Sequence, residues 1–395
     1  YRRLIIEDTG GCMSKVIIQE CKDYVLEDIM EKINDGIEKL GGWDLFVKPG
    51  DTVLLKANLI GPKTSDTAAV THSEFVRAIT KILKERGCNV WIGDSSGGAI
   101  AGIAPTAQSF KVSGYEKVAN EEGALIKNFD KEGVVEVEPK GKFKEKMFLA
   151  KPLFEADVVI NLPKLKTHSA NVYTGAVKNL FGCIPGLRKA TYHKMAPDKE
   201  DFGDIIADIH QATKFSLHIM DSITSMEGEG PTAGSVYKSN KILISTDPLA
   251  LDAVALNMLG LTVDDVPIII AAKKRNLGQW NLEDIIIEGD YDSIPKLNNF
   301  KLPKVLKSSK QKSNKAVVKV IDFFKTVPEI DTNKCKKCNM CVESCPMQAI
   351  DRATKKIDYS KCIECMCCHE LCLHKAVRLK KNNIIADVIA RLSLR

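Results

Sequence analysis

Nine of the thirteen cysteines lie between Cys335 and Cys372, and eight of these nine follow a regular spacing. Two runs, 335–345 and 362–372, each have the form C-x2-C-x2-C-x3-C. Three thiolates spaced in this way can hold three corners of an iron–sulfur cubane, while a more distant cysteine must supply the fourth corner. A zinc site could use a single C-x2-C pair, but two complete runs favour two 4Fe–4S clusters that carry low-potential electrons.

The first run ends in Cys345-Pro346 and resembles the ligand run of bacterial two-cluster ferredoxins, in which the fourth cysteine binds the other cluster. The resemblance implies Cys335, Cys338, Cys341 and Cys372 as ligands of one cluster, and Cys362, Cys365, Cys368 and Cys345 as ligands of the other. Two features depart from the pattern. Leu373 replaces the proline that often follows, and Cys367 is an additional thiol, which we interpret as a packed bystander. Similar segments, QAI at 348–350 and KAV at 375–377, indicate a duplicated half-module.

The chain before the cysteines alternates short β-branched runs with amphipathic stretches, a pattern typical of βαβ units. We therefore predict an α/β fold with a mainly parallel sheet and flanking helices, followed by a small α+β ferredoxin-like domain. The predicted strands are 16–19, 53–56, 90–93, 158–161, 217–221 and 242–245. The predicted helices are 26–40, 73–86, 204–213 and 248–259, and Thr71 with Glu74 predicts a capping box for the second of them.

Polar residues follow the predicted strands one after another. Ligands of open parallel sheets bind beyond the carboxyl ends of the strands, so this repetition predicts one shared site. Any single residue could instead satisfy the backbone of a turn. We predict catalytic roles for Lys164, His168, Lys178 and His193. The residues predicted to bind a ligand or cofactor are Lys56, Asn58, Asp94, Ser95, Asn161 and Asn179.

The chemistry of this site follows from its residue types. Its cations, Lys166 included, suit a carboxylate or a phosphate, and Asp94 and Asp221 could position those cations or hold magnesium. No GxGxxG opens a helix and no P-loop is present, which disfavours NAD and ATP. The glycines and cations of 174–194 predict a loop that closes over the site, with Tyr192 and His193 as candidate proton donors. Cys183 has apolar neighbours and is interpreted as inert.

The length of 395 residues favours two or three units. We predict an extension of doubtful origin (1–13), an α/β ligand-binding domain (14–295), a Lys-rich linker (296–327), the two-cluster domain (328–380) and a terminal helix (381–395). The linker is interpreted as a solvated connector or as a docking surface for an acidic redox partner. The formal charge of +6 is modest and partly concentrated in that linker, which argues against a nucleic-acid partner. No apolar run approaches the length of a membrane span, and clustered cysteines without a signal peptide indicate the cytoplasm.

Taken together, seven segments resemble the family called domain of unknown function 362, in its ferredoxin-fused form. These segments are VLLKANL, THSEFVRAI, IGDSSGG, DVVINLPKLKTH, TGAVKNLFGCIPGLRKATYHK, MEGEGPTAG and STDPLALDAVA. One departure is Ala57, where the family usually has proline after the lysine. The resemblance implies an α/β domain with an electron-transfer appendage, and it implies no particular reaction.

Our leading hypothesis is an iron–sulfur oxidoreductase that passes electrons from two 4Fe–4S clusters to an anionic substrate or organic cofactor at the strand ends. A flavin is a candidate cofactor, although no sequence feature requires one. The expected partner is a redox protein, such as a ferredoxin, a flavodoxin or an oxidoreductase. The alternatives are an electron-transfer subunit that docks a partner enzyme, and an iron–sulfur redox sensor.

Overall fold

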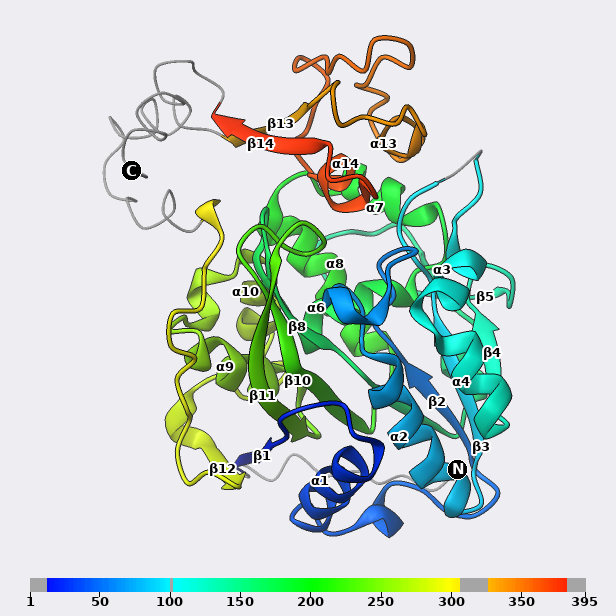
Figure 1. Cartoon of the computed structure of the whole chain (residues 1–395), viewed down its shortest axis with the longest axis vertical. Helices are drawn as coiled ribbons and strands as arrows, with labels where there is room; N and C mark the ends of the chain where they lie inside the picture. Colours follow the sequence, from blue (N-terminus) through cyan, green and yellow to red (C-terminus); the bar gives the residue numbers. More distant parts are fainter. Residues whose placement is uncertain (1–12, 100–101, 306–325, 382–395) are drawn as a thin grey trace.

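The computed structural model describes residues 13–99, 102–305 and 326–381. Most of these residues form one α/β domain, and the C-terminal ones, 326–381, form a small iron–sulfur module that lies over one end of it (Figure 1). Apart from residues 13 and 381, the predicted extension (1–13) and the predicted terminal helix (381–395) lie outside the described residues, as does most of the predicted linker.

The α/β domain is built on one large, mainly parallel sheet whose main path runs β12-β1-β11-β10-β7-β2-β3-β4. The central strands β2, β3, β4 and β7 are parallel to one another, and β7 pairs in parallel with β10. Strand β11 runs antiparallel to both β1 and β10, and the short strands β8 and β9 extend the sheet beside β10. The strands of this sheet are β1 (Ser14–Glu20), β2 (Thr52–Lys56), β3 (Asn89–Asp94), β4 (Leu125–Asn128), β7 (Val158–Asn161), β8 (Lys164–His168), β9 (Val172–Thr174), β10 (Leu217–Glu227), β11 (Ser235–Ser245) and β12 (Ile285–Gly289). A separate hairpin pairs β5 (Val134–Val137) with β6 (Met147–Ala150).

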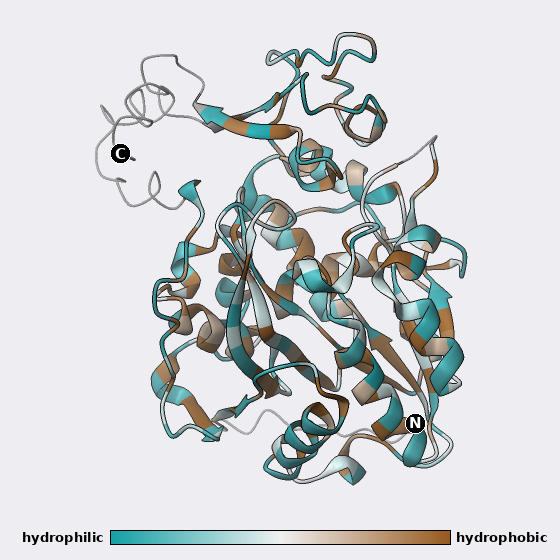
Figure 2. Cartoon of the chain, viewed as in Figure 1, coloured by the Kyte–Doolittle hydropathy of each residue, from teal (hydrophilic) through white to brown (hydrophobic). Residues whose placement is uncertain are grey.

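Helices cover both faces of the sheet because its strands are apolar on both sides. Leu54 packs into one core, whereas its neighbours Val53 and Leu55 pack into the other, as the alternation of a strand requires. The first face is covered by α6 (Ala176–Asn179), α8 (Lys199–Ala212), α9 (Pro248–Met258) and α10 (Pro267–Lys274). The second is covered by α1 (Leu26–Glu38), α2 (Ser73–Glu85), α3 (Thr106–Ser113) and α4 (Tyr115–Glu122). Figure 2 shows hydrophobic residues along the central strands and hydrophilic residues on the outward sides of surface helices such as α2 and α4.

The predicted α/β class with a mainly parallel sheet is confirmed, and the elements differ from prediction mainly in length. Strands β10 and β11 are longer than predicted, because each continues past the sheet centre as a long antiparallel pair. The predicted capping box was wrong. The side chain of His72 caps α2 by accepting a hydrogen bond from Glu74 N, whereas the Thr71 hydroxyl donates to Leu162 O.

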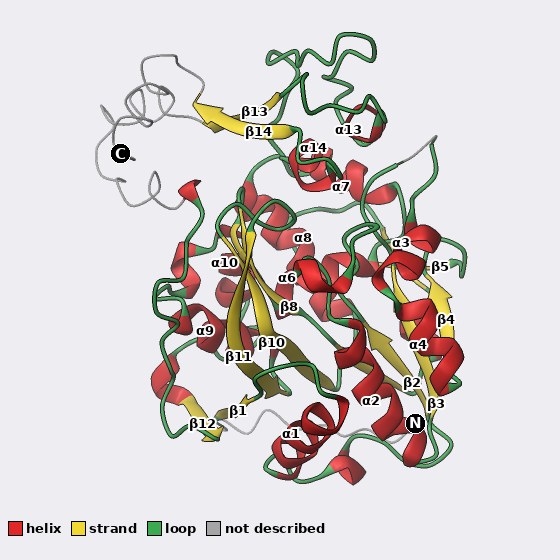
Figure 3. Cartoon of the chain, in the orientation of Figure 1, coloured by secondary structure: helices red, strands yellow, loops and turns green. Residues whose placement is uncertain are grey.

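The iron–sulfur module contains little regular structure, as the prevalence of loops in Figure 3 shows. Its strands β13 (Thr326–Ile330) and β14 (Val377–Lys381) pair antiparallel, and its two short helices are α13 (Met340–Glu343) and α14 (Cys367–Leu371). This agrees with the small α+β part that was predicted.

The described part of the predicted linker contacts the α/β domain. Leu297, Phe300 and Leu302 pack against its core, and Lys301 N donates a hydrogen bond to Glu227. Within the three described ranges, no helix combines the length and the apolar character needed to cross a bilayer.

Candidate iron–sulfur centre and adjoining pocket

The two cysteine runs adopt the same backbone conformation twice, each residue of the second lying 27 positions after its counterpart, as Cys362 does after Cys335. The two halves exchange equivalent hydrogen bonds: Asp331 N donates to Ala376 O and Asp358 N donates to Ala349 O, both at 2.7 Å. Paired positions also share left-handed φ angles, as for Asn339 (63°) and Met366 (61°). The module is thus an internal duplication in which each half completes the other.

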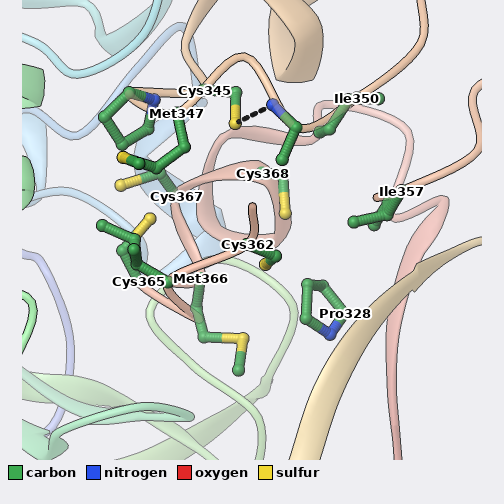
Figure 4. A pocket seen from close by; sticks show the side chains of 13 residues that line it. Pro328, Cys345, Met347, Ile350, Ile357, Cys362, Cys365, Met366, Cys367 and Cys368 are labelled. Atoms are coloured by element: carbon green, nitrogen blue, oxygen red, sulfur yellow. Dashed lines mark hydrogen bonds between the residues drawn. The ribbon is translucent and has the colours of Figure 1, made fainter. Parts of the chain in front are cut away.

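This exchange brings the fourth cysteine of one run to the other run. A pocket is lined by Cys345 of the first run and by Cys362, Cys365 and Cys368 of the second, and we call it the cysteine pocket (Figure 4). These four cysteines are one of the two predicted ligand sets. The remaining cavity lining is largely apolar and includes Ile350 and Ile357, which would shield a cluster from water.

The other predicted set is also close together. Cys341 is buried in the core of the module, Cys335 and Cys372 pack against that core, and Cys338 is exposed. Backbone N–H groups point at sulfur in equivalent places, from Ala349 to Cys345 at 3.3 Å and from Ala376 to Cys372 at 3.1 Å.

Such N–H···S hydrogen bonds are a known means of tuning iron–sulfur clusters. Within 13–99, 102–305 and 326–381, no three His, Cys, Asp or Glu side chains converge on one point as a single metal ion requires.

A second and larger pocket lies between the module and the edge of the sheet, and we call it the sheet-edge pocket. It encloses about 1010 Å³, part of it open to solvent. Its floor comes from the ends of β2, β3 and β8 and from the segment 174–193, and its roof comes from the iron–sulfur module.

The roof is attached by specific contacts. Ala99 N donates to Ser344 Oγ at 2.9 Å, and Thr232 Oγ1 donates to Glu370 O at 2.6 Å. Glu370 also places a carboxylate oxygen 3.0 Å from Nε2 of His168. Cys367 of α14 lines both the cysteine pocket and the sheet-edge pocket. The wall between the two pockets is therefore one short helical segment.

Two lysines of the sheet edge are held in buried ion pairs. Lys56 Nζ lies 2.9 Å from Asp94 Oδ1, and Lys164 Nζ lies 2.8 Å from Asp221 Oδ2. The Lys164 ammonium also donates to the hydroxyl of Tyr24. Burial raises the pKa of Asp94 and lowers the pKa of Lys164, and the ion pairing opposes both shifts. Neither lysine is among the residues that line the sheet-edge pocket.

Two other lysines line this pocket without a carboxylate partner. Lys166 is fully buried and donates to Asn58 Oδ1 at 2.6 Å and to Ala69 O at 2.7 Å. Burial, together with the charges of Lys178 and Lys164, lowers the pKa of Lys166 to about 7. Among the described residues, no hydrogen bond or ion pair holds the Lys178 ammonium, whose nearest aromatic contact is Phe181. Unpaired cations of this kind are suited to an anionic ligand.

Both histidines of the pocket are neutral at physiological pH. Burial lowers the pKa of His168 to about 4, and burial likewise lowers that of His193 to about 4. The N–H groups of Ala170 and Asn171 both donate to His168 Nδ1, so its proton resides on Nε2 and faces Glu370. Burial acts to raise the pKa of Glu370, but His168, Lys178 and His193 together lower it to about 2.

A chain of amide side chains connects these groups. Asn58 Nδ2 donates to Asn179 Oδ1 at 2.9 Å, and Asn179 Nδ2 donates to Asn161 Oδ1 at 2.7 Å. Because Asn58 also accepts from Lys166, the network holds the side chains of three separate segments in one arrangement.

A third lysine of the pocket lies at the glycine-rich turn after β3. Lys189 Nζ donates to Ser95 Oγ at 2.6 Å, and Gly186 N donates to the same oxygen at 2.8 Å. Burial lowers the pKa of Lys189 to about 8. Lys178 and Lys189 thus form two separate cationic points in one pocket.

The segment 174–194 was predicted to be a loop, and this was wrong. It forms the helical turns α6 (Ala176–Asn179), Leu180–Cys183 and α7 (Arg188–Met195). The buried carboxylate of Asp252 accepts hydrogen bonds from Ala176 N, Val177 N and the Tyr173 hydroxyl, and this anchors α6 despite its poor helix composition. The pKa of Asp252 is raised by burial to about 7. Asp252 therefore positions Lys178 and Asn179, which lie on α6.

Comparison with known proteins agrees with this architecture. The model of the family described as domain of unknown function (DUF362) matches residues 53–257, and the model of a 4Fe-4S binding domain matches residues 327–350. The chain belongs to the DUF362 family. The predicted fusion of this family with an iron–sulfur module is confirmed, and iron–sulfur binding is supported by the second match.

One curated relative in the same comparison is the thylakoid-associated protein sll1697 of Synechocystis sp.. It is 32% identical over 296 residues, which cover 74% of this chain and 89% of the relative. Among solved structures, the lactate racemase apoprotein of Thermoanaerobacterium thermosaccharolyticum aligns with a TM-score of 0.37 at 14% identity, covering 60% of this chain and 55% of that chain.

In this DUF362 member, the structure brings most of the predicted site residues together. Those that line the sheet-edge pocket are Asn58, Asp94, Ser95, His168, Lys178, Asn179 and His193. Lys56, Asn161 and Lys164 lie behind that lining, where Asp94, Asn179 and Asp221 hold them.

Sequence reasoning did not commit to Lys166, Lys189, Asp252 or Glu370 as site residues. Lys166 could have been predicted from the sequence, because it stands two residues from Lys164 and two from His168 and so lies on the same side of β8. Glu370 could not have been predicted from the sequence, because its place in the pocket depends on where the iron–sulfur module packs.

Proposed function

We propose that this protein is an iron–sulfur oxidoreductase that reduces a small anionic substrate or organic cofactor in the sheet-edge pocket. The observation that supports this most directly is the shared wall. Cys367 lines the cysteine pocket on one side and the cation-lined pocket on the other. An electron released at the cysteine pocket would reach a ligand in the sheet-edge pocket through one short helical segment.

The eight regularly spaced cysteines would hold two 4Fe–4S clusters in the crossed ligand sets predicted from their spacing. When bound, the clusters supply single electrons at low potential. The chain's own residues must bind the acceptor and supply the accompanying protons.

Lys178 and Lys189 are the anion-binding groups of this proposal. Lys178 has no ion-pair partner among the described residues and lies in the part of the pocket that His168 and Glu370 line. Lys189, with Ser95 and Gly186 N, lies at the glycine-rich turn. Reduction adds negative charge to the acceptor, and preorganised cations stabilise that charge as it develops.

Lys166 is the proposed proton donor. Its pKa of about 7 makes proton release easy near neutral pH, and its hydrogen bonds to Asn58 and Ala69 fix the ammonium in position. His193 lines the same pocket and stacks on Phe202, but its pKa of about 4 leaves it neutral at physiological pH, so it would not supply a proton. A two-electron reduction would then take one proton from Lys166 and the second from solvent, to which the pocket is partly open.

An electron-transfer subunit remains the second candidate function, because the iron–sulfur match alone supports it equally. A redox sensor is the third. A flavin gains no support from the comparisons, and the proposal does not require one. We further propose a cytoplasmic location, because solvent-accessible thiols of this kind persist in a reducing compartment.

Anaerobically purified full-length protein tests the proposal. We expect about eight irons and eight sulfides per chain. We also expect that dithionite-reduced protein is reoxidised by a substrate found in a panel of small carboxylates and phosphate esters. Lys178→Met should slow that reoxidation about 100-fold while leaving iron content unchanged.

A matched control is Lys22→Met, at an exposed lysine outside the lining of the pocket. If Lys178→Met and Lys22→Met are reoxidised at the same rate, the pocket is not the site of reduction. Reoxidation only by another protein would favour the electron-transfer subunit.

A further inference from the structure

The two halves of the iron–sulfur module differ sharply in exposure. Cys338 of the first run is exposed, whereas its counterpart Cys365 is half-buried and lines the cysteine pocket. The C-terminal end of the second run, at Cys367 and Glu370, forms the roof of the sheet-edge pocket. Both halves contact the α/β domain, the first through Ser344 and the second through Glu370, but only the first has a solvent-exposed ligand cysteine, Cys338.

The exposed loop around Cys338 also carries a cluster of positive charge. Lys334, Lys336 and Lys337 surround Cys335 and Cys338, and all three are exposed. No ion pair holds any of these three ammonium groups among the residues the structure describes, and the carboxylate of the neighbouring Asp331 accepts from Asn333 N. The equivalents of Lys336 and Lys337 in the second half are Ile363 and Glu364, and Ile363 lines the cysteine pocket. Lys334 has a lysine counterpart in Lys361, whose ammonium lies 3.7 Å from Asp358. The duplication has thus diverged at the two positions after the first cysteine, which are both basic in the first loop only.

We propose that the loop from Lys334 to Cys338 is the docking surface for a small electron-carrier protein with an acidic surface. This inference rests on the proposed function and adds where the electrons enter. One electron would pass per encounter, from the reduced carrier to the cluster that the first cysteine set would hold, and no atom would be transferred. Three unpaired cations beside an exposed ligand cysteine favour a brief, electrostatically steered contact.

The predicted Lys-rich linker is the other basic surface that could serve. Of its described lysines, Lys296 Nζ donates to Asn257 O at 2.7 Å and Lys301 Nζ lies 3.4 Å from Glu227. The loop of the first cysteine run differs in that its lysines stand directly beside predicted ligand cysteines.

Equilibrium binding of oxidised flavodoxin, an acidic carrier, to anaerobically purified protein tests this without any catalytic turnover. The triple variant Lys334→Glu, Lys336→Glu and Lys337→Glu should weaken binding about tenfold or more at low ionic strength, and the difference should shrink as salt is added. A control with the same change in net charge is the triple variant Lys22→Glu, Lys48→Glu and Lys214→Glu, at exposed lysines of the α/β domain. It should change the affinity less than about twofold.

Iron content and the dithionite-reduced spectrum show whether the first variant still holds its clusters, and Lys336→Glu alone serves if it does not. Equal weakening in both triple variants, or none in either, would overturn the docking surface. Loss of binding to a DNA duplex instead of flavodoxin would also overturn it. The proposed function fails separately: normal flavodoxin binding with unaltered reoxidation in Lys178→Met would contradict the pocket and leave the docking surface in place.

Discussion

Two regions of the sheet edge contain the same residue types with different surroundings. Lys164, Lys166 and His168 alternate along β8 and so lie on one side of that strand. Lys164 faces Asp221 and the hydroxyl of Tyr24, where its charge is neutralised. Lys166 and His168 face the sheet-edge pocket, where the Lys166 ammonium donates to an amide oxygen and a carbonyl oxygen and, among the described residues, to no carboxylate.

The difference teaches that residue type does not separate a structural lysine from a functional one. A buried lysine with a carboxylate at 2.8 Å has its charge compensated within the fold. A lysine in a cavity without such a partner retains its capacity to bind an anion or release a proton. Four predictions test whether Lys164 has a structural role and the lysines of the sheet-edge pocket have a functional one.

The largest expected effect is on stability. Lys164→Met should lower the free energy of unfolding by about 3–5 kcal/mol, because it leaves the fully buried Asp221 carboxylate without its cation. Lys178→Met should change it by less than about 0.5 kcal/mol, because no ion pair is broken. Chemical denaturation under anaerobic conditions measures both. Similar losses of unfolding free energy in Lys164→Met and Lys178→Met would show that the two lysines do not differ in their structural role.

The next effect is on reaction rate. Lys178→Met should slow reoxidation of the reduced protein by its substrate about 100-fold, since a preorganised cation is lost where negative charge develops. A folded Lys164 variant, obtained for example as Lys164→Arg, should retain the rate within about threefold, because arginine can still pair with Asp221. Stopped-flow absorbance follows the reaction. If Lys164→Arg is as slow as Lys178→Met, Lys164 also takes part in the reaction and the two lysines do not differ in role.

A smaller effect is expected on the pH dependence. The pKa of Lys166 is about 7, so its proton is present below this pH and absent above it. If the ammonium is the proton donor, the reoxidation rate should be constant below pH 7 and fall about tenfold per unit above it. Lys166→Met should be slower at low pH and show no such fall. A native profile that rises above pH 7 would contradict a donor role.

The smallest effect concerns the anchor of α6. Asp252→Asn should weaken substrate binding several-fold, because an amide cannot accept the three hydrogen bonds that Ala176 N, Val177 N and Tyr173 donate to the carboxylate. Tyr173→Phe removes only one of these bonds and should have a smaller effect. Substrate titration of the reduced protein separates the two. Unchanged substrate affinity in Asp252→Asn would show that α6 keeps its position without this anchor.

The sequence by itself determined the parts that depend on short-range spacing. The C-x2-C-x2-C-x3-C runs predicted which cysteines gather, and β-branched runs predicted the central strands, including 158–161 with its observed bounds. Most of the predicted site residues proved to share one pocket, because parallel strands end at one edge of a sheet. The helical turns of 176–195 were missed, because the hydrogen bonds that anchor their first turn come from the distant Asp252.

Only the tertiary structure decided which of these residues are compensated and which are available. Lys164 meets Asp221, His168 meets Glu370, and Lys166 meets Asn58, and in each case the partner comes from a segment far away in the chain. The residues next to a lysine in the sequence carry no information about such a partner. In a buried site the partner is decisive, because the free energies of a paired and an unpaired charge differ by several kcal/mol. The same holds for Cys367, whose place between the two pockets follows from how the iron–sulfur module packs on the sheet edge.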